Sequence, residues 1–203
     1  GIGSLAYLDQ FGLPVAELDH MSARIADGYD QLARGTISHV NKTAAALGCK
    51  PGQDCRTAAE LMTAAVQWSG PSPEFGESRF LLRERVGQPL VWGVDSTSLL
   101  RPEDNGAVMI TASHGALFAS AEKKPIAGPP LAAIFNDAGG GADGCGFSRL
   151  AVLDGEGVIA ATVAAASARI GDARSAWESG IISHTNAHAH AAGIAPGDDL
   201  PTF

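Results

Sequence analysis

The sequence predicts an α/β protein with an open, mainly parallel sheet covered by helices on both faces. Short, almost continuously apolar runs are typical of strands buried on both faces of a parallel sheet. These runs alternate along the chain with segments of helical character, as in layered α/β folds. The 203 residues are 45% hydrophobic and 18% charged, which is an ordinary globular composition.

Each element is predicted from its local pattern. Apolar runs predict strands at residues 90–94, 107–111, 131–135 and 158–163, with helices between them at 115–124, 146–154 and 173–192. The N-terminal part predicts a helix at 4–10, a strand at 13–18, and helices at 28–47 and 57–68. This order gives Rossmann-like layers, but neither a Gly-x-Gly-x-x-Gly fingerprint nor a P-loop lysine is present. We therefore expect no nucleotide and no other cofactor.

An internal repeat organises the chain. Residues 1–57 align without a gap to residues 146–202, at an offset of 145 residues. We call residues 1–58 the first copy, residues 146–203 the second copy, and residues 59–145 between them the A segment. A period of this length is the size of a domain, so the sequence predicts an internal duplication rather than a solenoid.

The repeat predicts the domain organisation and a partner. Residues 1–68 would hold the first copy and one further helix, residues 69–89 a linker, and residues 90–203 an α/β unit. The first copy has no A segment of its own ahead of it in this sequence. We therefore expect a homo-oligomer, or a heteromer with a chain related to residues 59–145.

Charge and hydropathy exclude several classes of function. The formal net charge of −8 offers no cationic surface for nucleic-acid phosphates. The longest apolar run, residues 158–166, is far shorter than the about 20 residues that span a bilayer. Three cysteines without framework spacing are typical of reduced thiols, so a cytoplasmic protein is expected.

Polar residues follow each predicted strand, where ligands bind in open α/β sheets. His114 is the expected acid or base, and Ser113 beside it is a further catalytic candidate. Asp137 or Asp95 would orient His114 or act as a second acid. The glycine-rich turn after the third strand would supply backbone amides to an oxyanion, although a plain turn is the alternative. The expected substrate-binding residues at these strand ends are Asp95, Ser96, Asn136, Gly139 and Gly140.

A second set of candidates is retained in both copies of the repeat. Arg169 would bind a substrate carboxylate, or would pair with Asp172 and order a loop. His184 is expected near the start of a helix with Ser183 as its N-cap, and Asn186 follows it. The further substrate-binding candidates are therefore Arg169, Asp172, Ser183, His184 and Asn186.

The histidines near the end of the sequence are not expected to form a metal site. His184 and His188 are four residues apart, a spacing found in metal sites on helices. No cysteine or glutamate is suitably spaced to complete the site, so a surface histidine cluster is predicted instead.

Together these residues predict a small-molecule enzyme. We expect a hydrolase that acts by acid–base catalysis on a metabolite bearing an amide or a carboxylate. The alternative is a non-catalytic ligand-binding or regulatory subunit that docks on a partner supplying an A-type segment. A metal-dependent hydrolase using His184 and His188 is a third, weaker reading.

Overall fold

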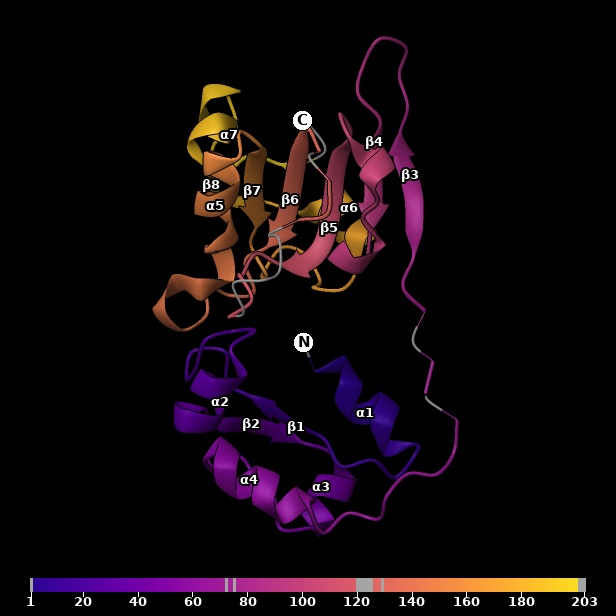
Figure 1. Cartoon of the computed structure of the whole chain (residues 1–203), viewed down its shortest axis with the longest axis vertical. Coiled ribbons are helices and arrows are strands. Elements are labelled where there is room, and N and C mark those ends of the chain that lie inside the picture. Colours follow the sequence, from indigo (N-terminus) through magenta and orange to yellow (C-terminus); the bar gives the residue numbers. More distant parts are fainter. Residues whose placement is uncertain (1, 72, 75, 120–125, 129, 201–203) are drawn as a thin grey trace. The chain divides into compact units, whose positions relative to one another are not determined.

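The computed structural model describes residues 2–71, 73–74, 76–119, 126–128 and 130–200. The chain divides into two units, Gly1–Gly76 and Glu77–Phe203, and each is described by itself (Figure 1). The fold is mixed α/β, as predicted. None of the helices among the described residues has the length and apolarity needed to cross a bilayer.

A six-stranded, mostly parallel sheet forms the centre of the second unit (Figure 1). Its strands are β3 (Arg79–Arg83), β4 (Val91–Val94), β5 (Val108–His114), β6 (Ala132–Asn136), β7 (Ile159–Val163) and β8 (Ile182–Thr185). The four strands from β4 to β7 run parallel, and β3 and β8 are antiparallel edges. The strand order follows the chain order without the reversal at which doubly wound sheets bind ligands. The described strands therefore form no switch-point crevice of the kind found in doubly wound sheets.

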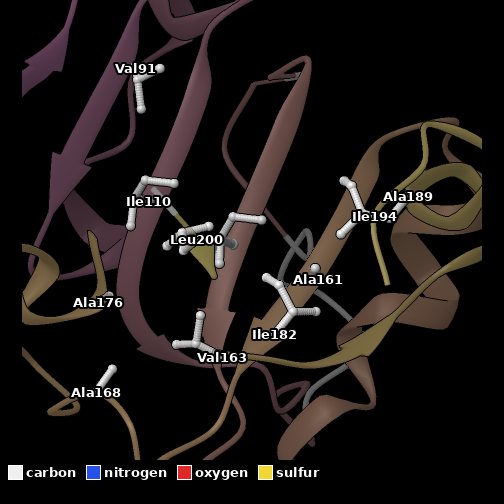
Figure 2. Close-up of a cluster of buried hydrophobic side chains, with 11 residues drawn as sticks. Val91, Ile110, Ala161, Val163, Ala168, Ala176, Ile182, Ala189, Ile194 and Leu200 are labelled. Atoms are coloured by element: carbon white, nitrogen blue, oxygen red, sulfur yellow. The ribbon is translucent and has the colours of Figure 1, made fainter. Parts of the chain in front are cut away.

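Alternate residues of the strands build two cores, one on each face. Ile110 and Val163 face helices α6 (Ala173–Ser179) and α7 (Ala187–Ala191) in the cluster drawn in Figure 2. Met109 and Phe135 point to the other face and pack with helix α5 (Arg149–Gly155). All five residues of β6 are buried, which explains why the strand is apolar almost throughout.

Three short 3-10 helices complete the described elements of this unit. They are η1 (Thr97–Leu99), η2 (Pro102–Asp104) and η3 (Ala142–Phe147). The first two connect β4 to β5, where no α-helix is found. Residues 115–119, where the sequence predicted the start of a helix, form an irregular loop instead. Residues 120–124, the rest of that predicted helix, lie outside the described part. Strand β3 lies in the stretch for which the sequence predicted a linker.

The first unit is built on a two-stranded antiparallel sheet. Its elements are α1 (Gly3–Asp9), β1 (Ala16–Leu18), α2 (Gly28–Arg34), β2 (Ile37–Val40), α3 (Lys42–Ala46) and α4 (Cys55–Met62). Ile37, Ala44, Cys49 and Ala58 form its small buried core. The helix predicted at 57–68 is α4, which begins earlier because Asp54 caps it and ends at Met62.

The long helices predicted at 28–47 and 173–192 are wrong in the same way. Each is a short helix, a strand and a second short helix, because the chain leaves the helix at Gly35 and at Gly180. A Cβ on Gly180 would lie 2.3 Å from the Ala176 carbonyl oxygen, and one on Gly35 would lie 2.4 Å from that of Gln31. Only glycine lets the extended chain turn back so closely over the helix end.

Candidate functional site

Asp95 and Asn136 join loops at the carboxyl ends of β4 and β6. The Asp95 carboxylate accepts hydrogen bonds from the amides of Ser78 (2.9 Å) and Ala173 (3.0 Å). Asn136 is buried, accepts from the amide of Ala138 and donates to the carbonyl oxygen of Ala168. Both side chains were expected to bind substrate, and both are instead engaged with backbone groups.

Asp137 is similarly occupied. One of its carboxylate oxygens accepts from the amides of Gly139 (2.9 Å) and Ala165 (2.8 Å), and the side chain is largely buried. Among the described residues, no hydrogen bond joins Asp137 to His114. Asp137 therefore orders the loops after β6 and β7 rather than orienting the imidazole.

The glycine-rich turn does not present the expected oxyanion donors. The Gly139 amide donates to the Asp137 side chain, and the Gly140 amide donates to the Asp137 carbonyl oxygen. Residues 138–141 all have positive φ, so the turn is a tight left-handed path. A Cβ on Gly146 would lie 2.0 Å from the Asp137 carbonyl oxygen, which shows how closely this turn packs on the next segment.

Ser113 and Ser96 hold the segment after β4. The Ser113 hydroxyl accepts from the Thr97 amide at 2.9 Å, and Ser96 caps the 3-10 helix η1 through the Ser98 amide. Among the described residues, no hydrogen bond links the side chains of Ser113 and His114. Ser113 is thus not arranged as a nucleophile activated by His114.

His114 ends β5 with its imidazole partly buried. The ring Nδ1 accepts the backbone N–H of Ala116 at 3.3 Å, which places the proton of the neutral ring on Nε2. Burial lowers the pKa of His114, and the positive charge of Arg149 lowers it further. The neutral ring is therefore the form present at pH 7, with an N–H donor on Nε2.

Arg149, at the start of α5, is the functional candidate that the sequence reading missed. It is 1% exposed, its guanidinium lies 4.8 Å from the Phe135 ring centroid and 5.9 Å from that of Phe118, and Nη2 donates to the Ala116 carbonyl oxygen at 2.9 Å. Its Nε has no hydrogen-bond partner. Burial lowers its pKa to about 10, so the group is still a cation at pH 7.

The surroundings of Arg149 do not neutralise it. No carboxylate among the described residues forms an ion pair with Arg149. A buried cation with aromatic neighbours and an unpartnered N–H is costly unless an anion completes its environment. The signal in the sequence is the i, i+4 spacing of Arg149 and Leu153, which puts an arginine on the buried face of a helix.

Arg169 and Asp172 lie elsewhere, along a groove of about 690 Å³ between the loop after β7 and α6. The Arg169 side chain is exposed, and Asp172 caps α6 by accepting the Ser175 amide. Arg174 and Glu178 also line the groove, so its charge is mixed. The structure does not join this pair to His114 by any hydrogen bond among the described residues.

The retained serine, histidine and asparagine of the second copy belong to β8 and to the cap of α7. The Ser183 hydroxyl lies 2.9 Å from the Thr162 hydroxyl and donates to the Thr162 carbonyl oxygen at 3.3 Å. Asn186 is the N-cap of α7. Ser183 is therefore not a helix cap as expected. His184 stacks on Phe147 with the ring centroids 3.8 Å apart. These contacts are structural in kind.

The histidines of the second copy form no metal site among the described residues. His188 is on α7 and its Nδ1 lies 2.9 Å from a carboxylate oxygen of Asp154, whereas His184 is on β8. No group of three metal-ligating side chains is found in the described part of the chain.

Comparison with protein-family models, with curated proteins and with solved structures finds no match to this chain. The assignment of function therefore depends on the geometry around His114 and Arg149.

Proposed function

We propose that residues 77–203 form a small-molecule enzyme, a hydrolase that acts on an anionic metabolite carrying an amide or a carboxylate. The site lies at the carboxyl ends of β5 and β6, around His114 and Arg149. One observation carries the proposal: a fully buried arginine, with no carboxylate partner among the described residues, lies beside a histidine of lowered pKa. Perturbed titratable groups of this kind are concentrated at functional sites.

Arg149 would bind the anionic group of the substrate. Its guanidinium is held in place by one backbone carbonyl and two aromatic rings, so its free N–H is preorganised for an incoming oxygen. A carboxylate bound there would gain the attraction of an unscreened charge at little cost in reorganisation.

His114 would act through Nε2. Because Nδ1 already accepts the Ala116 amide, the neutral ring offers its Nε2–H to a substrate oxygen on which negative charge develops. The lowered pKa keeps this neutral donor present at pH 7. Ser113 and Asp137 position the surrounding loops, and we give them no chemical step.

The test uses anions of increasing size with the full chain. We expect acetate, malonate and inorganic phosphate to raise the thermal unfolding midpoint in proportion to RT ln(1 + [L]/Kd), and Arg149→Met to abolish this shift. Arg169→Met, an exposed cation in the separate groove, is the matched control and should keep the shift. Loss of the shift in the Arg169 variant alone would place the anion in the groove and contradict the proposal.

Turnover is tested on the same variants. A panel of N-acyl amino acids and dicarboxylic acid amides would be screened for hydrolysis, with His114→Gln expected to lose at least about 100-fold in kcat/KM. His188→Gln is the control, because His188 is an exposed imidazole on α7. Hydrolysis that survives in His114→Gln would exclude His114 as the reacting group.

A non-catalytic ligand-binding or regulatory subunit is the second candidate. It is favoured by Ser183 and Asn186, whose side chains bind local backbone rather than facing an open site. Anion binding through Arg149 without hydrolysis of any compound in the panel would support this candidate over the enzyme.

A further inference from the structure

Strands β1 and β7 occupy corresponding positions in the two copies, but they differ in burial and in the number of strands beside them. All but the first residue of β7 are buried, because β7 lies between β6 and β8 in the sheet. The corresponding strand β1 is half-buried throughout and pairs with β2 alone among the described strands. The edge of β1 that corresponds to the β6 side of β7 therefore has no strand beside it in the described structure.

The A segment covers the second copy with apolar side chains. Val91, Ile110 and Ile134, from β4, β5 and β6, belong to the cluster that contains Ala161 and Val163 of β7 (Figure 2). In the first copy, the positions of Ala161 and Val163 are occupied by Ala16 and Leu18. The first copy thus keeps the apolar half of this core but has no counterpart of the covering half.

A hollow marks the place where the cover would lie. It has a volume of about 300 Å³ in the first unit, and Ala16, Leu18 and Ala23 are in its wall. Their counterparts Ala161, Val163 and Ala168 are all buried in the second unit. Helix α4 packs on the core of the first unit through Ala58, but it leaves this hollow open.

Helix α2 exposes apolar side chains at the positions where α6 contacts the A segment. Tyr29 is 90% exposed and Leu32 is 37% exposed. Their counterparts are Arg174, whose guanidinium lies 4.0 Å from the Phe80 ring centroid, and Trp177, which packs against the core of the second unit. Apolar residues this exposed, on a helix that also lines the hollow through Gln31, are typical of an interaction surface.

We infer that the first copy is a docking surface for an A-type segment other than residues 59–145. The partner would present a parallel strand layer like that of residues 91–136, and its last strand would pair with the free edge of β1 as β6 pairs with β7. A second copy of this chain is a poorer occupant, because its A segment is already covered by its own second copy.

At two positions beside the predicted docking edge, the first copy differs chemically from the second copy. Glu17 stands where the second copy has the fully buried Thr162, and its carboxylate accepts a hydrogen bond from the Ser4 hydroxyl, so the docked segment must tolerate a carboxylate at this position. Pro14 stands where Ile159 donates its amide to the Leu131 carbonyl oxygen, so one ladder hydrogen bond is lost at the start of the strand. Proline is tolerated at this position of a strand.

The test supplies an A segment to the complete chain. A second copy of residues 59–145 is joined directly ahead of Gly1, which reproduces the native junction of Cys145 with Gly146 because Gly1 aligns with Gly146. Hydrogen exchange is then measured on peptides covering β1. We expect the Ala16 and Leu18 amides to exchange at least about 100-fold more slowly than in the unextended chain.

The matched control is the same extended chain with Leu18→Asp, which should lose the added protection of β1 while β7 remains protected. Unchanged exchange of β1 would overturn the inference. Protection that appears only when Glu17→Thr and Gln31→Ala are also introduced would overturn it too, because the native side chains would then exclude such a segment. Concentration-dependent protection of β1 in the unextended chain, with a dimer in sedimentation, would assign the surface to a second copy instead.

Discussion

Asn41 and Asn186, 145 positions apart, make the same set of hydrogen bonds, each within its own unit. Each side-chain oxygen accepts the amide three residues further on at 2.9 Å. Asn41 also accepts the amide of Val15, just ahead of β1, at 3.0 Å, and Asn186 accepts that of Ala160 in β7 at 3.1 Å. Each side-chain nitrogen donates to a carbonyl oxygen at 2.8 Å. One buried amide thus joins a helix start to the segment leading into a strand in both units.

Replacement of Asn186 by alanine should destabilise the second unit. The change removes a helix cap and leaves a buried amide and a buried carbonyl unpaired, so we expect a loss of about 2–4 kcal/mol in the free energy of unfolding. Asn41→Ala should do the same to the first unit. Urea unfolding followed by hydrogen exchange would assign each loss to its unit, and Asn105→Ala, in an exposed turn, should change neither by more than about 0.5 kcal/mol.

Gly180→Ala should disrupt the turn from α6 into β8. The added methyl would lie 2.3 Å from a backbone oxygen, so the strand must move, and we expect a loss of at least about 2 kcal/mol in the free energy of unfolding. Gly155→Ala is the control, because a Cβ on Gly155 meets nothing within 4 Å. Equal stability of the two variants in urea unfolding would show that the turn has room for a side chain.

The stability of the second unit should depend on pH through His114. Because its folded pKa lies below the unfolded value of about 6.5, the unfolded state binds more protons as pH falls through this range. Stability from the neutral ring is therefore complete above about pH 7 and is lost progressively as pH falls from there to the folded pKa. The difference in unfolding free energy between the native chain and His114→Gln, measured from pH 7.5 to 5, should shrink accordingly; a constant difference would contradict the shift.

Arg149→Met should stabilise the second unit while abolishing anion binding. Methionine would fill the space between Phe135 and Phe118 without a buried charge, so we expect a gain of about 1–2 kcal/mol, reduced by the lost hydrogen bond to Ala116. Thermal and urea unfolding of the variant measure this directly. A large loss of stability would mean that the guanidinium stabilises the folded state, and would contradict the role of Arg149 in binding an anion.

The sequence predicts the central strands well because their burial on both faces leaves continuous apolar runs. It fails at β2 and β8, where Ile37, Val40 and Ala44 follow helical spacing although the chain leaves the helix at Gly35. That glycine acts through a close contact between backbone atoms, which no hydrophobic pattern records. β3 was missed because its alternation is weak and it lies in a stretch rich in turn residues.

For the candidate site, the sequence places His114 correctly at a strand end but does not identify its neighbour. No motif in the sequence singles out Arg149, because the rings and the carbonyl that surround it come from strands and loops distant in sequence. Conversely, Asp95 and Asn136 were predicted to bind substrate and Asp137 to orient His114, whereas the side chains of all three accept hydrogen bonds from backbone amides. Residue type and position could not distinguish these two uses of the same polar group.

The strand order of the second unit has a consequence for folding during synthesis. Each strand from β4 to β8 pairs with the strand made just before it, so the sheet can grow during synthesis one strand at a time. The face carrying Val91 and Ile110 is covered by α6, α7 and Leu200, which are all translated after β6. A nascent chain that has reached β6 therefore holds an uncovered apolar sheet face until residues 173–200 have emerged.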